Sequence, residues 1–464
     1  MVFSSMLFLW LFLPCALVGS RIAPKKLVNL FLLACSLFFY AWGEPIYILL
    51  MLVSVLSNWI LGLTMEATSH KKLILVIDIM FNLALLAYFK YANLLVETFN
   101  QFAGQKWIEE PNIPLPIGIS FFTFQVMSYI IDLYRGEYKA QKSIINLALY
   151  ISFFPQLIAG PIVRYKDIDQ QIEGREVSLE KTSAGIRRFI YGLGKKVLIS
   201  NALGIVVDKI YTIDIAELSA PLIWVAAILY TFQIYYDFSG YSDMAIGLGK
   251  MFGFDFQENF NYPYMSKSIR EFWNRWHISL STWFKEYLYI PLGGNRQGTV
   301  KTYRNLIIVF FLTGLWHGAS WNFVFWGIYH GIFSILERIG LGNWLKKHKT
   351  ISRIYTFAVV NFGWVFFRIE DIADAAEMVK RMFVPWQYTD SSYYVWEFVD
   401  AYVIFILIMA IIGMGILQLV AEKTKLMQKY RNSTTEIVGL LGIMLLCLMT
   451  LASETYNPFI YFRF

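Results

Sequence analysis

Two histidines lie in the most distinctive stretch of the chain, which begins at Arg270 and continues past His317. His277 stands in WNRWHISLSTW and His317 in GLWHGASW, both within an apolar and aromatic context. Ionisable side chains are costly inside a bilayer and usually mark functional sites there. A neutral imidazole can accept a proton from a hydroxyl group and later return it, which is the chemistry that an alcohol needs to attack an activated acyl group.

His317 is the strongest catalytic candidate. Its neighbours Gly314 and Gly318 would let a substrate approach the backbone closely, and Trp316 and Trp321 can wall a narrow passage. The alternative is a structural histidine that is hydrogen-bonded inside a helix bundle. The residues alone leave both interpretations open.

The two other histidines in apolar or aromatic segments have weaker cases. His277 is close to Glu271 and Arg275, which suggests the membrane boundary, so it can position a substrate or tune His317. The alternative is a boundary histidine whose ring is satisfied by water or a carbonyl group. His330 follows His317 by 13 residues and leaves the same two options open.

The string YYDFSGYSD, residues 235–243, concentrates polar groups among aromatic residues. Buried carboxylates in such a place can orient a histidine or bind a polar substrate. The alternative is a helix-breaking turn at the membrane surface whose aspartates act as caps. The candidate substrate-positioning residues are Asp237, Ser239, Tyr241 and Asp243.

The segment PLGGNRQG, residues 291–298, is a glycine-rich basic turn. Its backbone amides and the side chains of Asn295 and Arg296 can hold phosphates of a cytosolic donor, with Trp316 as a further candidate contact. Such a turn also commonly just reverses the chain.

Metal and serine-hydrolase chemistry are disfavoured. The sequence has no HExxH or HxxxH pair, its three cysteines have no CxxC spacing, and no GxSxG surrounds Ser239 or Ser320. We therefore expect no metal cofactor.

The composition indicates the elements that must position these residues. The 464 residues are 57% hydrophobic, 18% aromatic and only 16% charged, whereas soluble proteins are about 45–50% apolar and about 25% charged. The sequence therefore predicts an all-α integral membrane protein. The net charge of +7 is scattered in short clusters between apolar runs, which argues against nucleic-acid binding.

The apolar runs predict about 11 membrane-spanning helices in a single polytopic domain, residues 1–464, with the catalytic motifs in 235–330. Positive clusters fall on alternate connections, which places them on the cytoplasmic side. The run 143–163 contains Pro155, Gly160 and Pro161, which is typical of a re-entrant or broken helix. Residues 180–212 predict an amphipathic or interfacial helix that passes into a membrane segment, and 268–290 an interfacial segment. The clearest spans are expected near 26–43, 45–65, 73–93, 114–134, 219–236, 304–329, 354–368, 402–421 and 434–453.

Several of these motifs together resemble the membrane-bound O-acyltransferase (MBOAT) family, in particular its bacterial branch that acetylates polysaccharides such as alginate. The resemblance covers most of the chain and rests on the opening segment MVFSSMLFLWLFLP and on five further segments before and within the catalytic region. These are PLPIGISFFTFQ at 114–125, FFPQLIAGPIVRY at 153–165, YYDFSGYSDMAIGLG at 235–249, FWNRWHISLSTWFKEYLYIPLGGNR at 272–296 and GLWHGASWNFVFWG at 314–327.

The resemblance implies a helical fold around a central tunnel in the bacterial cytoplasmic membrane. It implies that His317 corresponds to the catalytic histidine of the family and His277 to its second motif position. It also implies acetyl-CoA as the cytosolic donor and a cell-surface polysaccharide as the acceptor. The implied partners are an extracytoplasmic SGNH-type acetyltransferase and membrane lipid.

Two alternatives remain open at this point. Within the same family, the protein can transfer D-alanine from an acyl carrier protein to teichoic acid. A transporter or flippase would also need a polar path through an apolar bundle, with histidines as proton relays.

Overall fold

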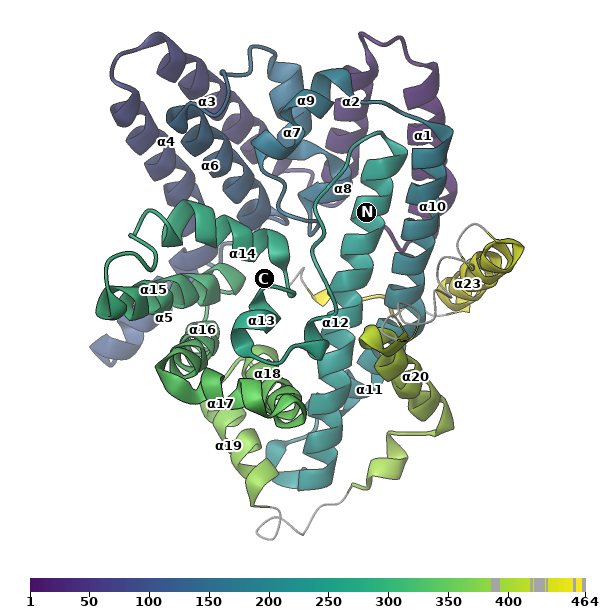
Figure 1. Cartoon of the computed structure of the whole chain (residues 1–464). Coiled ribbons are helices and arrows are strands. Elements are labelled where there is room, and N and C mark those ends of the chain that lie inside the picture. Colours follow the sequence, from purple (N-terminus) through teal and green to yellow (C-terminus); the bar gives the residue numbers. More distant parts are fainter. Residues whose placement is uncertain (385–392, 418–419, 421–429, 431–432, 454–455, 461–464) are drawn as a thin grey trace. The chain divides into compact units, whose positions relative to one another are not determined.

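The computed structural model describes residues 1–384, 393–417, 420, 430, 433–453 and 456–460. Every regular element among these residues is a helix, so the predicted all-α class is confirmed (Figure 1). The chain forms two compact units. Unit 1 contains residues 1–189 and 242–258, and unit 2 contains residues 190–241 and the described residues from 259 onward. The single polytopic domain expected from the sequence stays a prediction.

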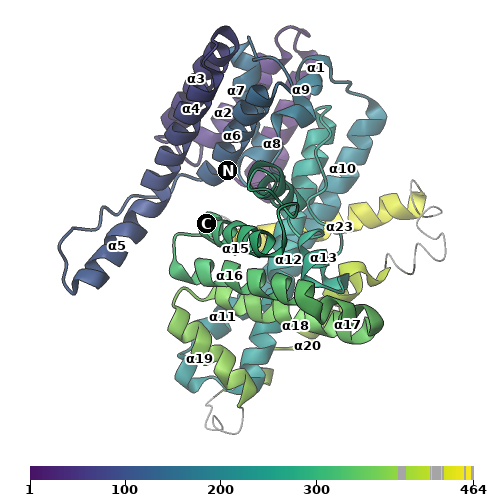
Figure 2. The same ribbon diagram turned by 60° about the vertical axis from the view of Figure 1, so that its left-hand side comes forward.

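Unit 1 is built from the N-terminal helices. Helices α3, α4 and α6 pack against one another, and α2 packs against α7 and α8 (Figures 1 and 2). The bounds are α1 Leu13–Ile22, α2 Val28–Ala41, α3 Ile48–Ala67, α4 Lys71–Leu86, α5 Ala92–Ala103, α6 Ile119–Arg135, α7 Ile144–Ser152, α8 Phe154–Leu157, α9 Tyr165–Gly174 and α10 Leu179–Gly194, whose last turn belongs to unit 2.

The predicted interruption in residues 143–163 is confirmed. Helix α7 ends at Ser152, Phe153 has the non-helical angles φ −56° and ψ 114°, and the four-residue helix α8 follows with Pro155 in its first turn. Proline lacks an amide hydrogen, which a helix needs in its interior but not in its first turn, so a new helix starts at Phe154 more easily than the old one continues through Pro155.

Unit 2 holds both candidate histidines. Helices α15 and α16 form an antiparallel pair, and α18 packs against α16 (Figure 2). The bounds are α11 Asn201–Tyr211, α12 Ala220–Met251, whose last turns belong to unit 1, α13 Ile269–Trp273, α14 Ile278–Phe284, α15 Thr299–His317, α16 Trp321–Leu336, α17 Gly342–Lys347, α18 Lys349–Arg368, α19 Ile372–Phe383, α20 Ala401–Ile411 and α23 Thr434–Ser453.

The described residues contain five helices that are long and apolar enough to cross a membrane, which supports a multi-pass membrane protein. They are Ile48–Ala67, Lys71–Ala103, Leu179–Tyr211, Lys349–Arg368 and Thr434–Ser453. Three shorter apolar helices accompany them, namely Phe8–Ile22, Val28–Ala41 and Ala401–Ile416. The predicted number of about 11 spans is not confirmed.

The prediction of one span over residues 304–329 was wrong. Helix α15 ends at His317, Gly318 and Ser320 are extended, and α16 begins at Trp321 and returns along α15. Glycines explain the close pairing, because a β-carbon at Gly314 would clash with the carbonyl group of Phe323. Hydropathy did not reveal the reversal because both helices of the hairpin are as apolar as a continuous span.

The polar string 235–243 does not break a helix. It lies inside α12, which is continuous over 32 residues, so the interpretation as a surface turn was wrong. Gly240 serves close packing instead: a β-carbon there would lie 2.8 Å from the carbonyl oxygen of Gly192 and 3.1 Å from the backbone nitrogen of Lys196.

Candidate active site

His317 occupies the point where the α15–α16 hairpin reverses. It is the last residue of α15, and its side chain is almost completely buried. The extended backbone at Gly318 lets the chain leave the helix immediately after the imidazole, and a β-carbon at Gly318 would clash with the ring of Phe323. The glycines that flank the histidine therefore serve the hairpin itself.

Aromatic rings surround the His317 imidazole inside unit 2. The ring centroid of Trp326 lies 5.1 Å away at an interplanar angle of 88°, and that of Phe367 lies 5.4 Å away at 77°. The ring of Trp316 lies at 5.1 Å and is also buried. Such edge-to-face contacts hold an imidazole in one orientation. Trp316 thus belongs to the wall around His317.

His277 lies beside His317, as the sequence suggested. The two ring centroids are 6.4 Å apart at an interplanar angle of 64°, and Phe238 of α12 contacts His277 edge-on at 4.6 Å. His277 precedes α14 and has the left-handed angles φ 44° and ψ 54°. Non-glycine residues rarely adopt that conformation, and it costs about 1–3 kcal/mol where the surroundings impose it. The side chain that leaves the backbone here is buried, and its ring lies beside those of Phe238 and His317.

Asn259 fixes the orientation of the His277 ring. Its Oδ1 lies 3.2 Å from His277 Nδ1 and accepts hydrogen bonds from the backbone amide and the hydroxyl group of Ser279, at 3.2 and 2.9 Å. An amide hydrogen can only be donated, so the Asn259 atom that faces it is the oxygen, and Nδ1 of His277 must carry a hydrogen. In a neutral ring Nε2 is then a proton acceptor.

The short helix α13, which leads to His277, is held at its start by an acidic side chain. Glu337 accepts hydrogen bonds from the backbone amides of Ile269 and Arg270, at 2.6 and 3.3 Å, and Ser268 caps the same helix through the amide of Glu271. Burial raises the pKa of the Glu337 carboxyl group, and these hydrogen bonds oppose the rise. The segment that carries His277 is therefore attached to the end of α16.

Asp237 has partners of its own. Its side chain is buried and pairs with Lys196 at 2.5 Å, and its other oxygen accepts the backbone amide of Ile460 at 2.8 Å. Lys196 also donates to the carbonyl oxygen of Pro458. Asn201 donates to the carbonyl oxygen of Tyr456 at 3.3 Å. The described contacts of Asp237 thus lead to the chain segment 456–460, a partner that the sequence did not suggest.

The three other polar candidates on α12 each have different surroundings. Tyr241 is buried and stacks on Phe459 with centroids 4.4 Å apart. Ser239 is buried, and its hydroxyl group has no hydrogen-bond partner among the residues that the structure describes. Asp243 belongs to unit 1, where Arg188 Nε donates to it at 2.8 Å. Their role in substrate positioning stays a prediction.

The candidate donor loop lies at the opposite end of α15 from His317. Asn295 and Arg296 are exposed, and Asn305 supports the loop by donating to the carbonyl oxygens of Leu292 and Gly294, at 3.1 and 3.0 Å. The 19 residues of α15 separate the loop from His317 by roughly 28 Å at 1.5 Å per residue. A donor that uses both places must be an extended molecule.

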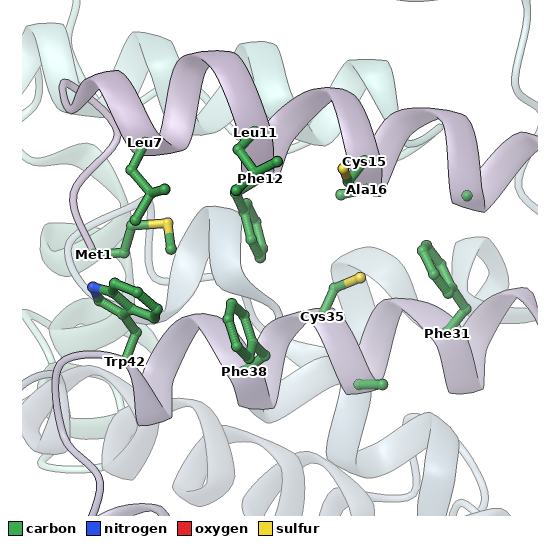
Figure 3. Close-up of a pocket in the computed structure, with 12 residues that line it drawn as sticks. Met1, Leu7, Leu11, Phe12, Cys15, Ala16, Phe31, Cys35, Phe38 and Trp42 are labelled. Atoms are coloured by element: carbon green, nitrogen blue, oxygen red, sulfur yellow. The ribbon is translucent and has the colours of Figure 1, made fainter.

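Unit 1 contains an apolar groove of about 430 Å³ between the apolar helix Phe8–Ile22, which includes α1, and α2 (Figure 3). Phe12, Phe38 and Trp42 line it together with the thiols of Cys15 and Cys35. The residues that line this groove include no pair of acidic and basic side chains. The candidate active site is therefore assigned to unit 2. Among the described residues, no group of three or more His, Cys, Asp or Glu side chains lies close enough to hold a metal ion.

The described residues thus combine helices long and apolar enough to cross a membrane with two buried histidine rings that lie side by side in unit 2. The model of the membrane-bound O-acyltransferase family matches residues 137–369, which include both histidines. The chain belongs to this family and is an O-acyltransferase.

The chain is also similar to individual enzymes that transfer acetyl or D-alanyl groups. The probable alginate O-acetylase AlgI of Pseudomonas putida is 40% identical over 491 aligned residues that cover 100% of both chains. The peptidoglycan O-acetyltransferase of Helicobacter pylori is 36% identical over 82% of this chain and 80% of its own. The teichoic acid D-alanyltransferase of Bacillus subtilis is 29% identical over 54% of this chain and 68% of its own.

Proposed function

We propose that this enzyme moves an acetyl group from acetyl-CoA on the cytoplasmic side of the bacterial inner membrane to a hydroxyl group of an extracytoplasmic glycan or of a partner protein that passes it to the glycan. The observation that carries the proposal is the pair of buried rings of His277 and His317, 6.4 Å apart, within the matched family region. Similarity to an alginate O-acetylase over the whole chain supports acetyl as the group and a polysaccharide such as alginate as the final acceptor.

His317 is the general base of the proposed reaction. Its imidazole accepts the proton of the acceptor hydroxyl group while the oxygen attacks the thioester carbonyl carbon. The carbon–sulfur bond then breaks, and the imidazolium returns the proton to the leaving thiolate, so that an ester and free coenzyme A are formed. His277 is a positioning residue, since Asn259 fixes its ring beside that of His317.

The donor enters from the loop that contains Asn295 and Arg296, whose exposed amide, guanidinium and backbone groups bind its phosphates. Its pantetheine arm then follows α15 toward His317. Because His317 is enclosed by Trp316, Trp326 and Phe367, these rings must move to open the central tunnel. An extracytoplasmic SGNH-type acetyltransferase receives the acetyl group or completes its delivery to the glycan.

Membranes that contain the protein, incubated with labelled acetyl-CoA and glycan, test the proposal. We expect label in the glycan as an alkali-labile ester. A parallel incubation with a D-alanyl carrier protein tests the alternative donor, for which similarity extends over 54% of this chain. Transfer of D-alanine without transfer of acetyl would reject acetyl-CoA as the donor, and absence of both transfers would reject the enzymatic assignment of this site.

A further inference from the structure

The groove between the apolar helix Phe8–Ile22 and α2 has an apolar lining. It runs from Gly19 and Phe31 at one end to Leu7 and Trp42 at the other, and the lining contains no charged, hydroxyl or amide side chain. Figure 3 shows the lining side chains of the two helices pointing toward one another. The groove therefore suits a hydrocarbon chain and not a polar ligand.

The groove is open along one side. Leu11, Phe38 and Trp42 line it and leave 57, 53 and 57% of their surface exposed, and Cys15 is also exposed. Phe12 is buried and stacks on Phe38 with ring centroids 6.3 Å apart. Apolar side chains that are exposed on a membrane helix meet lipid chains, which are as apolar as leucine. A lipid chain can thus enter the groove sideways from the bilayer.

The length of the groove matches one leaflet of a bilayer. Trp42, just past the end of α2, follows Phe31 by 11 positions, which corresponds to roughly 17 Å at 1.5 Å per residue. The hydrocarbon core of a bilayer is about 30 Å thick, so each leaflet contributes about 15 Å to it. The groove therefore accommodates one acyl chain of a phospholipid and is too short for a hydrocarbon that crosses both leaflets.

Positive charge gathers beyond the end of the groove that Gly19 and Phe31 form. Each of these residues lies about one turn from the connection between the two helices, which carries the exposed side chains of Lys25 and Lys26. Arg21 in the last turn of α1 adds a third positive charge. Such clusters are expected on the cytoplasmic side. Lysine side chains there extend along apolar surface and attract the phosphates of anionic lipids.

We propose that the groove binds one acyl chain of an anionic phospholipid from the cytoplasmic leaflet, with the phosphate of the lipid at Lys25 and Lys26. The two helices pack directly at one end, because a β-carbon at Gly19 would clash with the Phe31 ring. The acyl chain fills the space that the helices leave beyond this contact, so the lipid stabilises unit 1. Lipid binding here does not depend on the proposed acyl transfer, because no step of that reaction uses a residue of the groove.

A phosphatidylglycerol with a photoreactive group in one acyl chain tests the site. The full chain is reconstituted with a trace of this probe in phosphatidylcholine vesicles and irradiated, and the cross-linked residues are identified by mass spectrometry. Parallel samples contain unlabelled phosphatidylglycerol or additional phosphatidylcholine with the same acyl chains as a competitor. Cross-links to Leu49, which is 64% exposed on α3 and does not line the groove, report general contact with lipid in the same sample.

Two pairs of lysine variants separate the charge of the site from the charge of the surface. Lys25→Gln with Lys26→Gln removes the proposed phosphate contacts. Lys71→Gln with Lys72→Gln is the matched control, because these adjacent lysines are also exposed and begin α4 of the same unit. Cys15→Trp fills the groove from its exposed side and leaves the lysines in place.

We expect cross-links to Leu11 and Trp42 that phosphatidylglycerol displaces about tenfold more effectively than phosphatidylcholine, since two lysines contribute to binding. The Lys25 and Lys26 replacements should lower these cross-links about tenfold, Cys15→Trp should lower them too, and the control pair should leave them unchanged. Equal displacement by both lipids, or unchanged cross-links in the Lys25 and Lys26 variant, would overturn the proposal. Exclusion of the probe together with disulfide cross-linking of Cys15 between two chains would also overturn it and assign the groove to a second copy of the protein.

Discussion

Asn259 and His277 are joined by a hydrogen bond of 3.2 Å between Oδ1 and Nδ1. The two residues are 18 positions apart in the chain, and the bond sets which nitrogen of a strained, buried histidine carries the hydrogen. The relationship gives the second histidine a defined role: its ring is held in one tautomer beside the proposed base.

Replacing Asn259 with leucine should therefore lower kcat about five- to tenfold, because a neutral hydrogen bond of about 1 kcal/mol is lost at a ring that must keep its orientation. KM for acetyl-CoA should stay unchanged. Asn259→Asp, which retains an acceptor oxygen, should keep more activity. Asn343→Leu, at an exposed position of α17, is the control, and equal kcat values for the two leucine variants would refute the orienting role.

The buried pair of Lys196 and Asp237 predicts an asymmetric effect on stability. Lys196→Met leaves a buried carboxylate without its cation and should cost about 3–5 kcal/mol, which can be measured as a lower thermal midpoint. The double replacement Lys196→Met with Asp237→Leu removes both charges and should be less destabilised than the single variant.

The control for this pair is Lys380→Met, which breaks an exposed ion pair with Glu377 and should cost less than about 1 kcal/mol. If Lys196→Met instead leaves stability unchanged and abolishes transfer, the pair serves substrate binding. It would then not serve to hold the segment 456–460 in place.

Arg296 should contribute to donor binding and not to chemistry. Arg296→Ala is expected to raise KM for acetyl-CoA up to about tenfold, since a charge-assisted contact at an exposed site is weakened by solvent, and to leave kcat within about twofold. Arg353→Ala removes an exposed arginine from α18 and serves as the comparison. A fall in kcat with an unchanged KM would remove the loop from the donor site.

The α15–α16 hairpin should depend on its glycines. A β-carbon at Gly327 would clash with the carbonyl group of Phe310, so Gly327→Ala should destabilise the protein by about 1–3 kcal/mol through overpacking. The thermal midpoint of purified protein measures this effect. Gly442→Ala should be neutral or slightly stabilising, and equal midpoints for the two variants would contradict the close helix contact.

Much of the helical architecture could be predicted from the sequence, because lipid requires every backbone polar group to be paired within the segment that crosses it. The broken helix at Pro155 follows from the same local rules. The reversal at His317 could not be predicted, because apolar helices that face protein and apolar helices that face lipid have the same composition. Tertiary contacts such as those of Gly314 with Phe323 and of Gly327 with Phe310 distinguish a hairpin from a span.

The site was predicted in part. His277 and His317 were identified from residue type and context, and the structure brings their rings together. Asn259 carries no signal in its spacing, since its contact with His277 depends on how two loops pair. Asp237 was expected to orient a histidine or bind a substrate, yet its described partners are Lys196, Ser200 and the backbone amide of Ile460. The hydrogen bond between Asp237 and Ile460 joins residues more than 200 positions apart, and local sequence patterns do not encode such a pairing.

The central claim is that His317 is the base for acyl transfer, and the most direct measurement is acetyl transfer from labelled acetyl-CoA by a His317→Ala protein of normal abundance and thermal midpoint. The control is His348→Ala, at an exposed histidine. Loss of a positioned general base lowers a rate by typically 10²–10⁴-fold, so we expect label in the glycan to fall at least about a hundredfold for His317→Ala and not for His348→Ala. Transfer by His317→Ala at the wild-type rate would contradict the account.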